Sequence, residues 1–233
     1  MEIILQEKVK IVFTSAGNPK TWTQYLKENG VTVAHVVSSS KFAIKAQEAG
    51  VDAVVAEGFE AGGHNGREET TTLCLIPHVV EMVDIPVIAA GGIGKGSQIA
   101  AVLALGAQGV QIGSRFAATH ESSSHENFKN EILKAQEGDT QLTLKELAPV
   151  RLLKNKFYQK VQDAYANGAK KEDLAELLGK RRAKKGMFEG DLHEGELEIG
   201  QVSALINEIL SVEEVFNELL SEYTATIEKM NFL

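Results

Sequence analysis

The first half of the chain contains five short apolar runs. Each run is nearly free of polar residues, which is typical of strands buried on both faces of a parallel sheet. A half-exposed strand would instead alternate apolar and polar residues. We therefore predict five buried parallel strands, at residues 10–15, 32–38, 53–57, 86–90 and 109–112.

Helical segments separate these runs at the spacing of a strand–helix repeat. The last of them follows Ser97, a residue type favoured at helix N-termini, and ends at Gly106, which is typical of C-termini. Alternating strands and helices indicate an α/β fold. The predicted helices cover residues 21–29, 40–49, 71–83 and 98–105.

The alternation stops after Phe116, and the rest of the chain is predicted to be helical. A loop is expected at 179–200, where a run of lysines and arginines precedes a run of acidic residues. We interpret these runs as a solvated loop with internal charge pairing, and a nucleic-acid or targeting patch is the alternative. The predicted helices cover residues 127–135, 144–168, 171–178 and 201–228.

The charge balance and the cysteine content restrict partners and compartment. With 24 Lys and Arg against 32 Asp and Glu, the formal net charge is −8, which argues against a general nucleic-acid binder. The one cysteine, Cys74, cannot form an internal disulfide, and the first residues lack the basic flank and apolar length of a signal peptide. We expect a cytoplasmic protein that binds neither nucleic acid nor membranes.

A glycine-rich turn follows the fourth apolar run, with the sequence Gly91-Gly92-Ile93-Gly94-Lys95-Gly96-Ser97. It leads into a predicted helix, so its backbone N–H groups are available to an anion. Lys95 is followed by glycine rather than Ser or Thr, which excludes a P-loop. The third glycine of a dinucleotide-binding fingerprint is also missing. The turn therefore predicts a local anion site of another kind.

A second turn of this kind follows the fifth run, at Gln111-Ile112-Gly113-Ser114. Gly113 lets the backbone approach a phosphate, and Ser114 can donate its hydroxyl. Two such turns after consecutive strands match the phosphate site of (β/α)8 barrels, which lies after the last two strands. The alternative is tight packing at the strand ends.

His64 is the histidine best placed for catalysis. It lies between glycines in the flexible polar loop predicted after the third run, at the same end of the sheet as the two turns. An imidazole titrates near neutral pH and can act as base or acid, although a structural or solvated histidine is the alternative. Glu57 and Glu60 could join it in a metal site. This loop lacks the ligand spacing of metal motifs, so we expect no metal.

Three motifs, in this order and spacing, resemble the nitronate monooxygenase family, formerly called 2-nitropropane dioxygenases. The family includes related FMN-dependent enoyl-acyl-carrier-protein reductases. A fourth element, Gly200-Gln201-Val202, resembles a further part of the family pattern. The three motifs are Glu60-Ala61-Gly62-Gly63-His64-x-Gly66, Ala89-Ala90-Gly91-Gly92-Ile93 and Gln111-Ile112-Gly113-Ser114-Arg115-Phe116.

The resemblance implies a partial TIM-type (β/α)8 barrel, with strands four to eight of the family and without the first three βα units. Residues 1–126 would form this FMN-binding part, and residues 127–233 a helical segment packing on it. FMN is the implied cofactor, and His64 the implied catalytic base or acid. The residues expected to hold FMN are Gly91, Gly92, Gln111, Ile112, Gly113 and Ser114.

The activity implied by the resemblance is the oxidation of alkyl nitronates by oxygen, with FMN as electron carrier. One alternative is an enoyl-acyl-carrier-protein reductase that uses FMN and NADPH. Ala61 replaces a serine that we associate with those reductases, which favours nitronates. A second alternative is a non-catalytic truncated barrel. Open barrel edges would favour pairing with another chain or homo-oligomers.

Overall fold

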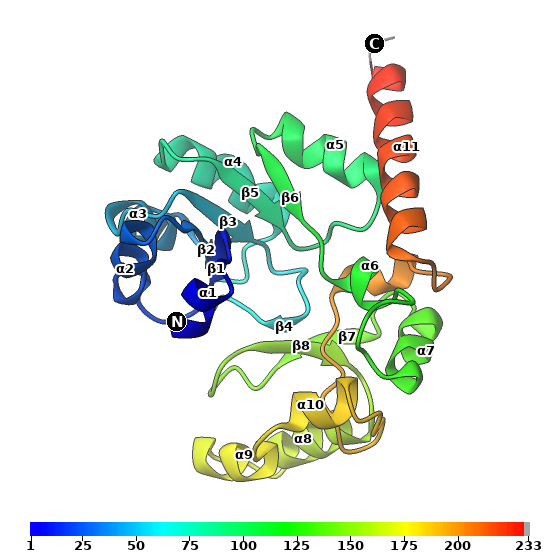
Figure 1. The fold of residues 1–233 in the computed structure, drawn as a ribbon. Coiled ribbons are helices and arrows are strands. Elements are labelled where there is room, and N and C mark those ends of the chain that lie inside the picture. Colours follow the sequence, from blue (N-terminus) through cyan, green and yellow to red (C-terminus); the bar gives the residue numbers. More distant parts are fainter. Residues whose placement is uncertain (231–233) are drawn as a thin grey trace. The chain divides into compact units, whose positions relative to one another are not determined.

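A computed structural model describes residues 1–230, drawn in Figure 1. The chain forms two compact units, each built from several segments. Unit 1 comprises Met1–Phe59, Glu68–Ala90 and Ala101–Gln111, and unit 2 comprises Glu60–Arg67, Gly91–Ala100 and the chain from Ile112 onward. The functional division into residues 1–126 and 127–233 stays a prediction, because it concerns where a cofactor binds.

Unit 1 contains a five-stranded parallel sheet in the order β1-β2-β3-β5-β6. The α/β class and the partial barrel are confirmed, as are all five predicted strands to within two residues. Val54, Val55 and Ala56 of the third strand have no exposed surface, as expected for a strand covered on both faces. The strands are β1 (Ile11–Thr14), β2 (Thr32–Val37), β3 (Ala53–Glu57), β5 (Val87–Ala90) and β6 (Gly109–Gln111).

The helices of unit 1 follow the predicted segments. Helices α2, α3 and α4 contact the strands β2, β3 and β5 (Figure 1). Leu26, Ala43 and Ile76, one on each of these helices, are fully buried. At one helix start the Ser39 side chain accepts a hydrogen bond from the Phe42 N–H, as an N-cap does. The helices are α1 (Glu2–Gln6), α2 (Thr23–Glu28), α3 (Ser40–Glu48), α4 (Thr72–Met82) and α5 (Gly96–Ala104), whose first turn belongs to unit 2; a 3-10 turn, η1, spans Pro19–Thr21.

The edge strands of this sheet are open within the described residues. β1 pairs only with β2, and β6 pairs only with β5. Ile11 and Phe13 on β1 are more than half exposed, at 58% and 51%. The outer strand therefore presents apolar side chains to solvent.

Unit 2 contains an antiparallel sheet that the sequence did not predict. Its strands are β4 (Gly63–His64), β7 (Thr140–Thr143) and β8 (Val150–Leu153), in the order β4-β8-β7 (Figure 1). The predicted polar loop around His64 is present, but Gly63 and His64 within it form the short strand β4, which pairs with β8.

The predicted helix over 144–168 was also wrong in its first half. Leu144 has a left-handed backbone, with φ of 54°, and Pro149 has no N–H to continue a helix. All four residues of β8 are buried in the sheet. The helix α8 begins only at Lys156, where the Asn155 side chain accepts a hydrogen bond from the Tyr158 N–H.

Unit 2 contains two apolar clusters. One cluster includes Phe128, Ile132 and Ile199, and the other includes Leu152 and Phe157. The remaining helices are α6 (Ser114–Ala117), α7 (Glu126–Lys134), α8 (Lys156–Ala166), α9 (Lys171–Leu178), α10 (Arg182–Met187) and α11 (Val212–Met230), with a 3-10 turn η2 at Gln201–Leu205.

Two further expectations for the C-terminal half need correction. The predicted continuous helix over 201–228 is interrupted after η2, and Leu210 there forms a β-bridge with Thr119. The loop at 179–200 contains α10. Its charges pair internally as predicted, with Lys184 Nζ 3.1 Å from a carboxylate oxygen of Glu189. Within residues 1–230, no helix combines the length and apolarity that a membrane span requires.

Candidate functional site

His64 lies on the short strand β4, so its backbone position is fixed by pairing with β8. In the antiparallel register His64 faces Val150, and the next amide, Asn65 N–H, donates to the Pro149 carbonyl oxygen at 2.9 Å. The His64 side chain itself is exposed. The site therefore combines a rigid backbone with an imidazole that a substrate can reach.

Glu198 is the acidic residue beside the His64 strand. A Cβ atom at Gly63 would lie 2.8 Å from its Oε2, so the carboxylate occupies the side-chain space of Gly63. Burial raises the pKa of Glu198, and the charge of His64 lowers it in part. Glu198 and His64 thus interact electrostatically, although they lie 134 positions apart in the sequence.

The first glycine turn has the backbone that the sequence predicts. Gly91 and Gly92 lie in the left-handed region, with φ of 91° and 66°, which residues with a side chain rarely adopt. The amides of Gly94 and Lys95 both donate to Gln98 Oε1, at 2.8 and 3.0 Å. These bonds close the turn and do not involve the Gly92 amide.

The N-terminus of α5, an anion site in the sequence analysis, already holds a carboxylate of this chain. The Gly96 N–H donates to Glu222 Oε2 at 2.7 Å, and Lys95 Nζ lies 3.2 Å from Glu222 Oε1. Burial alone would lower the pKa of Lys95, but the carboxylates of Glu222 and Glu218 raise it. The chain's own helix α11 therefore supplies the anion at this position.

Arg115, next to the second turn, is engaged in the same way. Its side chain is buried, with Nη1 3.2 Å from the Glu208 carbonyl oxygen and Nη2 3.4 Å from Glu218 Oε2. The cations closest in sequence to both turns are thus paired within unit 2. A phosphate at the turns would be held by backbone N–H groups and a hydroxyl.

The second turn, after β6, presents such donors. Gln111 ends the strand, Ile112 follows, and a Cβ atom at the exposed Gly113 would meet no atom within 4 Å. Ser114 Oγ accepts a hydrogen bond from the Gly200 N–H at 3.0 Å. The Ser114 hydroxyl proton is therefore directed to another acceptor.

The donor set fits the phosphate of FMN. Within residues 1–230 the amides of Gly92 and Gly113 have no hydrogen-bond acceptor. Together with the Ser114 hydroxyl they supply three donors, and a phosphate monoester offers three acceptor oxygens. Open space at Gly113 leaves room for the group. In the described part of the chain, no cluster of three metal-ligating side chains occurs, and Glu57, Glu60 and His64 form none.

Glu57 has a raised pKa that its sequence context does not by itself predict. It ends β3 and is half-buried, and burial raises its pKa to about 7. A carboxyl group of this kind can exchange a proton near neutral pH. Its position directly after a run of buried residues was the available signal.

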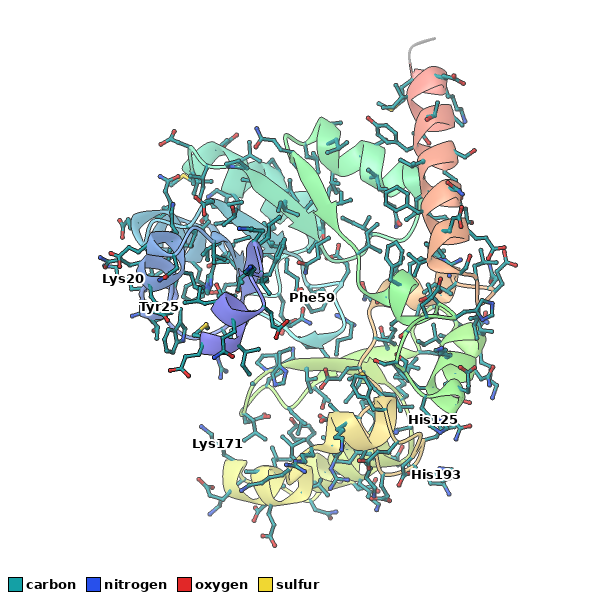
Figure 2. All side chains as sticks on the ribbon, viewed as in Figure 1. Lys20, Tyr25, Phe59, His125, Lys171 and His193 are labelled. Atoms are coloured by element: carbon teal, nitrogen blue, oxygen red, sulfur yellow. The ribbon has the colours of Figure 1, made fainter. Side chains whose placement is uncertain are left out.

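The other described histidines have structural or surface positions. His35 is buried on β2 with its Nδ1 2.7 Å from Thr14 Oγ1. His125 Nδ1 accepts from the Asn127 N–H and caps α7. Figure 2 labels His125 and His193; His193 is exposed.

The sequence profile of nitronate monooxygenase matches residues 1–222. The chain belongs to the nitronate monooxygenase family. Members of this family are enzymes, and the motif set around His64 lies inside the matched range.

Individual relatives agree with this family assignment. A probable nitronate monooxygenase of Bacillus subtilis is 33% identical over 95% of this chain, which spans 66% of that protein's length, just under two thirds. Among solved structures, FabK from Thermotoga maritima is 41% identical, with a TM-score of 0.92 over 99% of this chain and 73% of FabK. A nitroalkane oxidase from Streptomyces ansochromogenes is 30% identical, with a TM-score of 0.79 over 98% of this chain and 68% of that protein.

Proposed function

We propose that the chain is an FMN-dependent oxidoreductase that oxidises alkyl nitronates with oxygen. One observation carries the proposal: unit 2 holds His64 and the donors of both turns, Gly92, Gly113 and Ser114, within one compact group of contacts. The nitroalkane oxidase among the similar structures supports a nitro compound as substrate. The lack of an internal disulfide partner for Cys74 supports a cytoplasmic location.

The two turns would hold the phosphate and the ribityl chain of FMN. Gly91, Gly92, Gly113 and Ser114 would bind the phosphate, because their backbone and hydroxyl groups are hydrogen-bond donors. Gln111, the last residue of β6, and Ile112, which follows it, would contact the ribityl chain. When bound, FMN supplies the electron transfer from the nitronate to oxygen.

His64 would act as base toward a neutral nitroalkane. The α C–H bond breaks, its electron pair delocalises into the nitro group, and the proton moves to an imidazole nitrogen. Glu198 favours this step, because its negative charge beside β4 stabilises the imidazolium that forms. For a substrate that is already a nitronate, His64 would orient the anion by hydrogen bonding.

Replacement of His64 tests the catalytic assignment. His64→Ala should retain bound FMN and lose roughly 10²- to 10⁴-fold in turnover of the nitroalkane, the range of general acid–base catalysis. The matched control is His193→Ala, which removes an exposed imidazole elsewhere in unit 2. Unchanged turnover in His64→Ala would remove this residue from the mechanism.

The second candidate is reduction of an enoyl thioester by NADPH, since the motif set also resembles FMN-dependent enoyl-acyl-carrier-protein reductases. Anaerobic titration separates the two reactions. Bleaching of bound FMN by a nitronate but not by NADPH supports the proposal, and rapid bleaching by NADPH supports the reductase. A chain that binds no FMN would correspond to the non-catalytic alternative.

A further inference from the structure

The element Gly200-Gln201-Val202 has no role in the proposed chemistry, yet it lies at the centre of the site. We call residues 198–202, which include it, the clasp segment. These five consecutive residues contact the His64 loop and both glycine turns, all within unit 2.

The clasp segment contacts the His64 loop at successive positions. The Gln201 N–H donates to the Glu60 carbonyl oxygen at 2.9 Å. Gly62 lies so close that a Cβ atom there would be 2.5 Å from Gly200 N, and the Glu198 carboxylate occupies the space beside Gly63. The backbone leading into His64 is therefore packed directly on the clasp segment.

The same segment reaches both turns. The Gly200 N–H donates to Ser114 Oγ at 3.0 Å in the second turn. In the first turn, a Cβ atom at Gly94 would lie 2.6 Å from Val202 Cγ2. One short segment thus contacts three motifs. Their contacted residues, from Glu60 to Ser114, span 54 positions, and all of them lie more than 80 positions before the clasp segment.

We propose that the clasp segment fixes the position of His64 relative to the phosphate-binding turns, with Gly200 as its positioning residue. The proposal rests on the proposed function only for the identity of the ligand. A Cβ atom at Gly200 would lie 2.8 Å from the Glu60 carbonyl oxygen and 2.9 Å from Ser114 Oγ. Any side chain at this position must therefore move the His64 loop and the Ser114 turn apart.

The test compares Gly200→Ala with Gly109→Ala, a control whose Cβ would meet its nearest neighbour, Ile88, at an ordinary 3.8 Å. Two quantities are measured on the full chain: the Kd for FMN, and the NMR resonance of the His64 Cε1–H group in the absence of FMN, assigned with His64→Ala. We expect Gly200→Ala to weaken FMN binding at least about tenfold and to shift the His64 resonance. Gly109→Ala should do neither.

A folded Gly200→Ala protein that lacks either the weaker FMN binding or the shifted His64 resonance would overturn the proposal, because the segment would then not link the two motifs. If Gly200→Ala does not fold, Ser114→Ala replaces it, since this variant removes only the oxygen that accepts from Gly200. It should still shift the His64 resonance, and an unmoved resonance overturns the proposal. If the wild-type chain binds no FMN, the proposed function fails, while the resonance still decides the role of the clasp.

Discussion

The amide of Gly200 donates a hydrogen bond to the hydroxyl of Ser114 at 3.0 Å, although 86 positions separate the two residues. Because the oxygen accepts this bond, the Ser114 proton is free to donate elsewhere. The backbone of Gly113 beside it faces open space. The hydrogen bond from Gly200 therefore orients the Ser114 hydroxyl as a donor to an anion.

Removal of that donor should weaken FMN binding. A hydrogen bond to a charged phosphate contributes roughly 1.5 kcal/mol or more, so Ser114→Ala should raise the Kd for FMN about tenfold or more. Quenching of flavin fluorescence on binding measures the change. Ser221→Ala, at an exposed position of α11, is the matched control and should leave the Kd unchanged.

Glu222 should stabilise the chain through the start of α5. Glu222→Ala removes the acceptor of the Gly96 N–H and a partner of Lys95, and the free energy of unfolding should fall by about 1 kcal/mol, as for the loss of a helix cap. Glu222→Gln retains an acceptor oxygen and should lose less. Chemical denaturation measures both, with Glu228→Ala on the exposed end of α11 as control. Equal stability of Glu222→Ala and wild type would contradict this role.

Glu196 should make the folded protein less stable as the pH rises. Burial, together with the charge of Glu198, raises the pKa of Glu196 to about 7, although Arg182 opposes the shift. Between pH 4.5 and 7 the unfolded chain releases this proton first, so the unfolded state gains relative stability and the penalty is complete above pH 7.

Glu196→Gln removes the buried charge and tests this pH dependence. At pH 8 the free energy of unfolding of the variant should exceed that of wild type by about 1 to 3 kcal/mol. At pH 4 the two free energies should be nearly equal. Glu137→Gln, at an exposed position, is the control. A stabilisation of the same size at both pH values would show that the charge is not its cause.

The parallel sheet was predictable because its determinants are local. Runs such as 53–57 are apolar throughout, and a strand buried on both faces needs no other signal. The glycine turns were predictable for the same reason, since Gly91 and Gly92 adopt backbone angles that glycine favours. His64 could be singled out because its neighbours are glycines.

The antiparallel sheet and the clasp segment were not predictable, because their determinants are distant in sequence. Pro149 is a local signal against a helix at Val150, but the sheet partners of Val150, His64 and Thr143, could not be identified from the sequence. The sequence around Lys95 and Gly96 indicates a site for an external anion. In the structure, Glu222 of α11 occupies that position. Glu198 is distant from His64 in sequence, and the two residues interact electrostatically only in the folded chain.

A comparison of the affinities for FMN and riboflavin tests whether the two turns form a phosphate site. Riboflavin carries the same ring and ribityl chain without the phosphate, so the ratio of the two Kd values isolates the contribution of Gly92, Gly113 and Ser114. Two or more charge-assisted hydrogen bonds predict that FMN binds at least about 100-fold more tightly, and that Ser114→Ala narrows the ratio. Equal affinities for FMN and riboflavin would contradict the account.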